Sequence, residues 1–160
     1  LLLCLYMYTC VVSVPKQDRK LDVYEFQKEP LVLVCSPSNP LAGRSEIDIH
    51  QLQFEKFIAF EEGVPTRIWI DGIFSRYNII VRPVMEFDNI ETIKRAVEIN
   101  SGVSILPQTA ITQELSNNTL KAIPFSNDNF YRPTGIIIRK EKVRSRACRY
   151  FIELLRKNNE

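Results

Sequence analysis

The chain has 160 residues, of which 45% are hydrophobic and 25% are charged, and its formal net charge is +2. These values are ordinary for a globular chain with room for one domain or two small lobes, and the charge is too small to indicate by itself a nucleic-acid-binding or membrane-binding protein. The four cysteines form no C-x-x-C pair and no cluster with the single histidine, so the sequence predicts reduced thiols in a cytoplasmic protein and no metal site.

The first 14 residues, LLLCLYMYTCVVSV, form an apolar run that begins without an initiator methionine. A helix that spans a bilayer needs roughly 20 apolar residues, so this run is too short to be one. It also lacks the positively charged start and the small-residue cleavage site of a secretory signal peptide. We therefore expect the sequence to be a fragment of a longer chain.

Apolar runs predict buried strands in the first part of the chain. A strand is expected over 21–26 and should end at Glu29-Pro30, because proline cannot donate to a strand ladder. The continuous runs Leu31–Cys35 and Phe57–Phe60 are typical of strands that are covered on both faces.

The turn Glu61–Thr66 leads into a helix that is expected over 65–77. Pro65 suits the first helical position, where its missing N–H costs no hydrogen bond. Arg67 and Asp71 have the i, i+4 spacing of a helical ion pair. The broad apolar face of this helix consists of Trp69, Ile70, Ile73, Phe74 and Tyr77.

A strand over 79–87, which Pro83 predicts to lie at a sheet edge or to bend there, precedes the most strongly patterned helix of the chain. Asp88 and Asn89 both suit its N-cap, and Glu91 lies at capping-box distance from Asp88. Its buried stripe is expected to be Ile90, Ile93, Ala96 and Val97, and its solvent face Glu91, Lys94, Arg95 and Glu98, with Glu91 paired to Arg95.

Gly102 is expected to end this helix in the left-handed conformation that glycine tolerates. A buried strand over 103–106 follows, and then a weak helix over 109–115. Strands over 120–125 and 135–139 and a last helix capped by Ser145 complete the chain. This alternation of strands and helices predicts an α/β fold with a mostly parallel sheet.

Two helix N-termini, at Gly63–Thr66 and at Asp88–Asn89, each follow a strand. Free N–H groups and the helix dipole make such a position suitable for an anion or a polar ligand, although both segments also fit plain turns and caps. Thr66 would add a hydroxyl group and Arg67 a cation.

Other features point away from catalysis and from nucleic acid. The chain has no phosphate-loop motif, and no nucleophile and base are spaced as in a catalytic site. We expect His50 and the pair Glu61-Glu62 to be solvent-exposed side chains. The basic stretch 139–149 is interpreted as a solvated face, and no helix-turn-helix pattern is present.

Five segments in register resemble the effector-binding domain of LysR-type transcriptional regulators, a resemblance that covers about residues 11–157. They are EPLVLVCSPSNPLAG (29–43), FIAFEEGVPTRIWIDGIF (57–74), FDNIETIKRAVEINSGVSILP (87–107), TLKAIPF (119–125) and RPTGIIIRKEKVRSRACRYFIELLR (132–156).

The resemblance implies a two-lobed α/β fold like that of type II periplasmic binding proteins, with lobe I largely missing. Residues 1–13 would be an unplaced remnant of lobe I, residues 14–130 lobe II, and residues 131–160 the returning strand and helix of lobe I. The family's N-terminal DNA-binding domain has no counterpart in this sequence, so DNA would be bound only through that absent part.

The family's effectors are small molecules that bind between the lobes without a cofactor. Carried onto this sequence, the resemblance implies an effector site at Val64, Pro65, Thr66, Asp88, Asn89 and Ile90. It also implies a cytoplasmic regulator that is not an enzyme and that forms dimers or tetramers, in which the helix over 65–77 can take part in pairing. The alternatives left open are an extracytoplasmic solute-binding receptor of the same fold and an enzyme of unidentified type.

Overall fold

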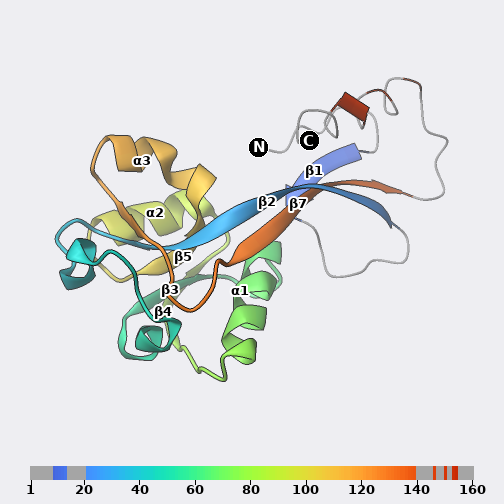
Figure 1. The fold of residues 1–160 in the computed structure, drawn as a ribbon. Helices are drawn as coiled ribbons and strands as arrows, with labels where there is room; N and C mark the ends of the chain where they lie inside the picture. The colour runs from blue at the N-terminus through green and yellow to red at the C-terminus, as the bar shows by residue number, and fades with distance from the viewer. Residues whose placement is uncertain (1–8, 14–20, 140–145, 147–149, 151–152, 155–160) are drawn as a thin grey trace. The chain divides into compact units, whose positions relative to one another are not determined.

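The computed structural model describes residues 9–13, 21–139, 146, 150, 153 and 154 (Figure 1). The chain divides into two compact units. We call residues 30–131 the central unit, and residues 1–29 together with 132–160 the terminal unit. This division begins later in the chain than the lobe boundary expected at residue 14, and the assignment of lobes stays a prediction.

The central unit contains most of the described secondary structure. Strand β2 (Leu21–Cys35) ends in this unit, and ten further helices and strands follow it there. They are η1 (Pro40–Gly43), η2 (Ile49–Phe54), β3 (Phe57–Phe60), α1 (Pro65–Arg76), β4 (Pro83–Phe87), α2 (Ile90–Glu98), β5 (Ser104–Pro107), η3 (Gln108–Ile111), α3 (Thr112–Ser116) and β6 (Lys121–Ile123), where η marks a 3-10 helix.

The terminal unit contains β1 (Thr9–Ser13), which pairs antiparallel with β7 (Tyr131–Arg139). Arg132 on β7 donates from Nε to Glu29 Oε2 at 2.7 Å, which ties β7 to β2. The predicted helix that begins at Ser145 falls mostly on residues outside the described ranges, so its apolar face and cap stay predictions.

The expected break at Glu29-Pro30 is wrong, because β2 runs without interruption through both residues. Pro30 has no N–H to give, but the neighbouring Leu31 N–H donates to Phe130 O at 2.8 Å. The hydrogen bonding therefore resumes immediately after the proline, and one long strand replaces the two that the sequence predicted.

The expectation of a mostly parallel sheet is also wrong for the described strands. β2 pairs antiparallel with both β5 and β6, and only β3 and β4 form a parallel ladder. A helical crossover produces parallel neighbours, and α1 provides one between β3 and β4. Two 3-10 segments rather than an α-helix connect β2 to β3, and the two strands are not neighbours.

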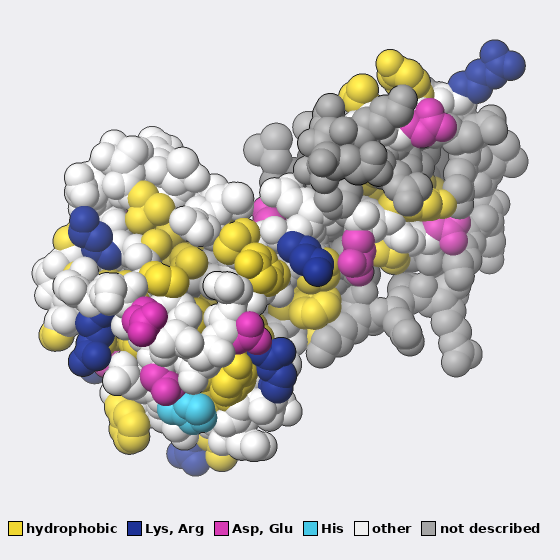
Figure 2. All heavy atoms as spheres, viewed as in Figure 1, with side chains coloured by type: hydrophobic (Ala, Val, Ile, Leu, Met, Phe, Trp, Pro, Cys, Tyr) yellow, Lys and Arg dark blue, Asp and Glu magenta, His cyan; other side chains and the backbone are white. Residues whose placement is uncertain are grey.

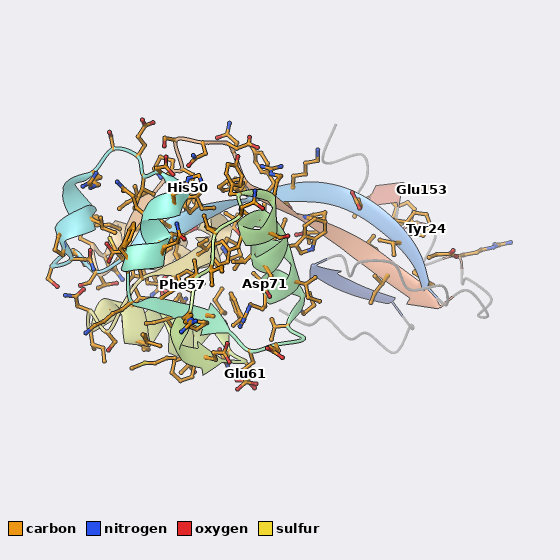
Figure 3. The ribbon with its side chains drawn as sticks, turned by 90° about the horizontal axis from the view of Figure 1, so that it is seen from below. Tyr24, His50, Phe57, Glu61, Asp71 and Glu153 are labelled. Atoms are coloured by element: carbon orange, nitrogen blue, oxygen red, sulfur yellow. The ribbon has the colours of Figure 1, made fainter. Side chains whose placement is uncertain are left out.

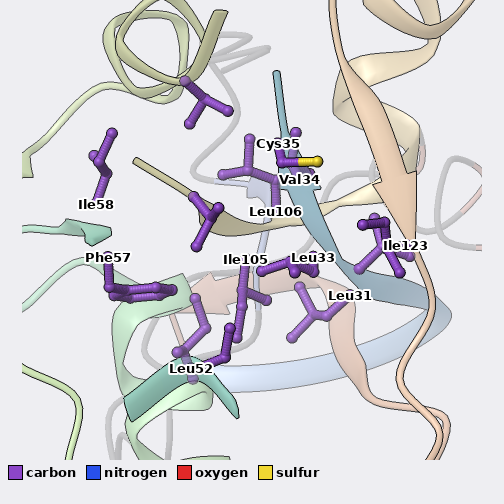
Figure 4. Close-up of a cluster of buried hydrophobic side chains, with 14 of the residues drawn as sticks. Leu31, Leu33, Val34, Cys35, Leu52, Phe57, Ile58, Ile105, Leu106 and Ile123 are labelled. Atoms are coloured by element: carbon purple, nitrogen blue, oxygen red, sulfur yellow. The ribbon is translucent and has the colours of Figure 1, made fainter. Parts of the chain in front are cut away.

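The core of the central unit lies between its strands and the buried faces of its helices (Figure 4). Leu33, Leu52, Phe57 and Ile105 are each at most 1% exposed, and Phe57 packs edge-on against Phe74 of α1 with ring centroids 5.6 Å apart. This confirms that the apolar runs 31–35 and 57–60 are covered strands. The unit thus has a continuous hydrophobic core of its own, the main source of folding free energy.

The stripe expected on α2 is confirmed, because Ile93, Ala96 and Val97 are buried and Ile90 is half-buried against the core. Lys94 was expected on the solvent face but is only 6% exposed. Its Nζ lies 2.8 Å from Glu91 Oε1 and 2.8 Å from Glu114 Oε1, so the predicted pairing of Glu91 with Arg95 is replaced by one with Lys94.

Candidate functional site

The two turns singled out in the sequence lie at one edge of the β3–β4 ladder. Phe60 and Phe87, the last residues of the two parallel strands, are register partners. Beyond them, Glu61 N–H donates to Phe87 O at 2.9 Å and holds the start of one turn against the end of the other strand. Since parallel neighbours end at the same edge, the structure brings together the turn before α1 and the turn before α2 (Figure 1).

The first turn reaches α1 through a left-handed glycine and an uncapped N-terminus. Gly63 has φ +88°, a conformation that side chains rarely adopt. Val64 is the N-cap of α1 and makes no side-chain cap hydrogen bond, and Pro65 occupies the start of the helix. Thr66 is only 4% exposed, so this residue is buried.

The second turn is more exposed and is capped by its own side chain. Asn89 is the N-cap of α2, and its Oδ1 accepts from Glu91 N–H at 2.7 Å. Asp88 lies outside the helix, so the capping box expected between Asp88 and Glu91 does not form. Asp88 and Asn89 are exposed, and Ile90 is half-buried.

Arg67, near the start of helix α1, connects the two loops that precede α1 and α2. Its Nη1 donates to Phe60 O at 2.6 Å and to Glu86 Oε1 at 2.7 Å, and its Nε donates to Asp71 Oδ1 at 2.8 Å, as the i, i+4 spacing predicted. Burial lowers the pKa of Arg67, but the hydrogen bonds to Glu86 and Asp71 outweigh it and raise that pKa overall. The contact with Glu86 could not be read from the sequence, because it depends on the register of β3 and β4.

The remaining candidates lie elsewhere or face solvent. His50 is half-exposed on η2, 2.7 Å from Asp48, and the hydrogen bonds from His50 lower the pKa of Asp48. Figure 3 shows His50 and Glu61 at opposite edges of the central unit, so the histidine does not belong to the two turns. Glu61 and Glu62 are exposed, as expected.

Further features of the described residues bear on metals, thiols and charge. Among these residues, no three histidine, cysteine, aspartate or glutamate side chains are grouped to hold a metal ion, and no helix is long and apolar enough to cross a bilayer. Burial raises the pKa of the free thiol of Cys35 to about 11, so this thiol is protonated and unreactive. On the face shown in Figure 2, acidic and basic side chains of the central unit are interspersed.

Comparison with known proteins gives a consistent family. The family model described as the LysR substrate binding domain matches residues 10–160. A RuBisCO operon transcriptional regulator of Allochromatium vinosum is 28% identical over 91% of this chain and 48% of its own length. A probable RuBisCO transcriptional regulator of Synechocystis is 32% identical over 82% of this chain and 39% of its own length. The chain thus spans less than half the length of these two relatives.

Solved structures show the same fold. The CcmR regulatory domain of Synechocystis, solved in complex with 2-PG, is 28% identical and has a TM-score of 0.83 over 96% of this chain and 74% of that one. The effector binding domain of QuiR, solved in complex with shikimate, has a TM-score of 0.85 over 95% of this chain and 71% of that one, at 20% identity. The fold is therefore the α/β, type II periplasmic-binding-protein-like fold that the resemblance implied, and the chain belongs to the LysR substrate-binding domain family.

Proposed function

We propose that this chain is the effector-sensing part of a LysR-type transcription regulator and that the two turns at the β3–β4 edge hold its small-molecule effector. One observation carries this proposal: two helices begin side by side, directly after neighbouring parallel strands. The start of a helix is suited to bind a polar group through its N–H groups and its dipole, although the N–H of Glu91 already donates to Asn89 Oδ1. The effector-binding residues would be Val64, Pro65, Thr66, Asp88, Asn89 and Ile90.

The charges around the two N-termini suggest which groups of an effector they would bind. The turn before α1 contains exposed Glu61 and Glu62, and α2 begins with exposed Asp88 before its cap and Glu91 in its first turn. An anionic group is favoured by the helix dipole and disfavoured by neighbouring carboxylates. Since carboxylates lie near both N-termini, we propose that each binds a hydroxyl or another neutral polar group of the effector.

The site can be tested without knowing the physiological effector. Because solved members of the fold were bound to 2-PG and to shikimate, these two compounds are suitable probes. We expect at least one of them to shift the backbone amide NMR signals of Gly63, Thr66 and Asn89 in a saturable titration. Saturable shifts confined to other parts of the chain would contradict the placement of the site.

Two substitutions test the side chains. Thr66→Val keeps the volume of a buried residue and removes its hydroxyl, and Asn89→Ala removes an exposed amide. Each should weaken probe binding about tenfold. Since Asn89 also caps α2, Asn89→Ser is its matched control: it keeps a cap and loses the amide, so it separates loss of a contact from fraying of the helix. Unchanged affinity in both Thr66→Val and Asn89→Ser would refute these assignments.

The relatives support a proposal for the role of the intact protein. The curated relatives named above are transcriptional regulators of more than twice the matched length, so the intact protein is proposed to bind DNA through a further, N-terminal part. It is proposed to act in the cytoplasm and without catalysing a reaction. The solute-receptor alternative is not favoured by these relatives.

Self-association is proposed to use α1 and β4. These elements present apolar side chains to solvent, with Ile68 36%, Val84 52% and Met85 40% exposed. Exposed apolar side chains on a strand and a helix are suited to an interface between copies. We expect Val84→Glu together with Met85→Glu to lower the sedimentation coefficient of the chain to that of a monomer. An oligomer that is unaffected by this double substitution would place the interface elsewhere.

A further inference from the structure

We propose that Arg67 is a positioning residue that fixes the spacing between the two effector-binding turns, and that it is not itself a ligand for the effector. The inference rests on the proposed function, since it assigns a task to a residue beside that site. It also replaces the sequence-based interpretation of Arg67 as a cation available to an anionic effector.

Arg67 contacts the ends of β3 and β4, the two strands that lead into the two turns. Phe60, whose carbonyl oxygen accepts from Nη1, is the last residue of β3 and directly precedes the first turn. Glu86, whose carboxylate accepts from the same nitrogen, lies two residues before Asp88 and the second turn. Arg67 itself belongs to the first turn of α1. One guanidinium therefore connects the end of β3, the end of β4 and the start of α1.

The charge balance around Arg67 argues against a role as an anion receptor. A cation in the first turn of a helix is disfavoured by the helix dipole, so its position needs compensation. Two carboxylates, from Asp71 and Glu86, lie within 2.8 Å of its nitrogens, and only 14% of its side chain is exposed. The positive charge is thus more than offset before any effector arrives. The planar guanidinium can satisfy all three acceptors at once, which a lysine ammonium on a flexible stem cannot do with the same geometry.

The two carboxylates have separable roles. Asp71 is on α1 with Arg67, so their pair acts within one helix. Glu86 is on β4, so its pair with Arg67 connects the start of α1 to the strand that leads into the second turn. Removing the Glu86 carboxylate should therefore loosen the spacing, whereas removing the Asp71 carboxylate should affect only α1.

The experiment measures hydrogen exchange at the amide of Glu61, which donates to Phe87 O and so reports directly on the link between the turns. We expect Arg67→Gln and Glu86→Gln to accelerate this exchange roughly fivefold to tenfold, the effect of losing about one hydrogen bond's worth of local stability. Arg67→Lys should give an intermediate rate. Asp71→Asn and Arg76→Gln, an exposed arginine on the same helix paired with Asp128, should leave the rate within about twofold.

Amides of β5 serve as the reference for global stability, since this strand lies in the core. A uniform acceleration that includes β5 would reduce Arg67 to a general stabilising residue and overturn the proposal. An unchanged exchange rate at Glu61 in Arg67→Gln would also overturn the proposal.

Probe binding separates this proposal from the proposed function. Titration with 2-PG and shikimate should show affinity falling in Arg67→Gln and Glu86→Gln together, in the order of their exchange rates. If Arg67→Gln abolishes binding while Glu86→Gln has wild-type affinity, Arg67 is a direct ligand and the proposal is wrong. If neither probe binds the wild-type chain, the choice of effector class fails, but the exchange rates at Glu61 still decide the role of Arg67.

Discussion

Single residues at the end of α2 show how far local sequence patterns determine structure. The segment Asn100-Ser101-Gly102 ends the helix, as predicted, but the left-handed residue is Asn100, with φ +59°. Gly102 is needed for another reason: a Cβ atom there would lie 2.3 Å from the carbonyl oxygen of Lys56. Asparagine and glycine both tolerate positive φ, so the sequence could not distinguish them, and the approach of Lys56 is a contact between distant parts of the chain.

Gly102→Ala should destabilise the chain by about 1–3 kcal/mol, because either the Lys56 backbone or the start of β5 must move to admit the methyl group. The Lys56 carbonyl also accepts from Val103 N–H at 2.8 Å, so this movement would strain a hydrogen bond. Gly43→Ala is the matched control, since its Cβ meets nothing within 4 Å. Urea denaturation measures both variants, and equal midpoints would show that the close approach costs nothing.

At the scale of elements, a buried ion pair joins α2 to α3. Lys94 Nζ donates to Ala110 O at 3.2 Å and lies 2.8 Å from Glu114 Oε1, with both side chains at most 10% exposed. The 3.6-residue pattern predicted the apolar stripe of α2 because that face needs only a core to pack against. It could not predict Lys94, because burial of this residue depends on α3, which lies further along the chain and has only a weak helical pattern.

Lys94→Met should destabilise the chain by about 3 kcal/mol or more, because it leaves the Glu114 carboxylate buried without its partner. Lys94→Met combined with Glu114→Leu should recover much of this loss, since the unpaired charge is then removed as well. Chemical denaturation of the two single variants and the double variant gives the coupling. Additive effects of the two substitutions would indicate that the pair contributes no net interaction.

The same pair predicts a dependence of stability on pH. Burial raises the pKa of Glu114, but the hydrogen bond from Lys94, a hydrogen bond to its own backbone and the charge of Lys94 together outweigh it and hold that pKa below its ordinary value of 4.5. A carboxylate with a lowered pKa in the folded state contributes stability above its unfolded-state pKa and loses it as the pH falls through the folded-state value. Unfolding free energies at about pH 6 and about pH 3 should therefore differ more in the wild type than in Glu114→Gln.

At the scale of the whole molecule, the sequence predicted both turns but not which edge they share. Their adjacency follows from the parallel register of β3 and β4. Before the structure, only the family resemblance implied that the two turns form one site. The sequence did not predict that β2 runs antiparallel to β5 and β6. An alternation of strands and helices does not indicate the direction of a strand that begins in another unit. Among the described residues, the hydrophobic core of the central unit consists of side chains between Leu31 and Phe130.

Because the central unit has a continuous core of its own, a fragment of residues 30–131 should fold by itself. We expect its NMR spectrum to show dispersed amide signals that overlay those of the same residues in the full chain, and its urea unfolding to be cooperative. A collapsed spectrum would mean that the terminal unit supplies contacts that the central unit needs.

The hydrogen bond from Leu31 N–H to Phe130 O means that the central unit begins and ends at a single point. A segment whose two ends lie next to each other can be removed, or inserted into a loop of another protein, without distorting that protein. The central unit thus has the geometry of an exchangeable cassette, in which about a hundred residues can be replaced at one junction.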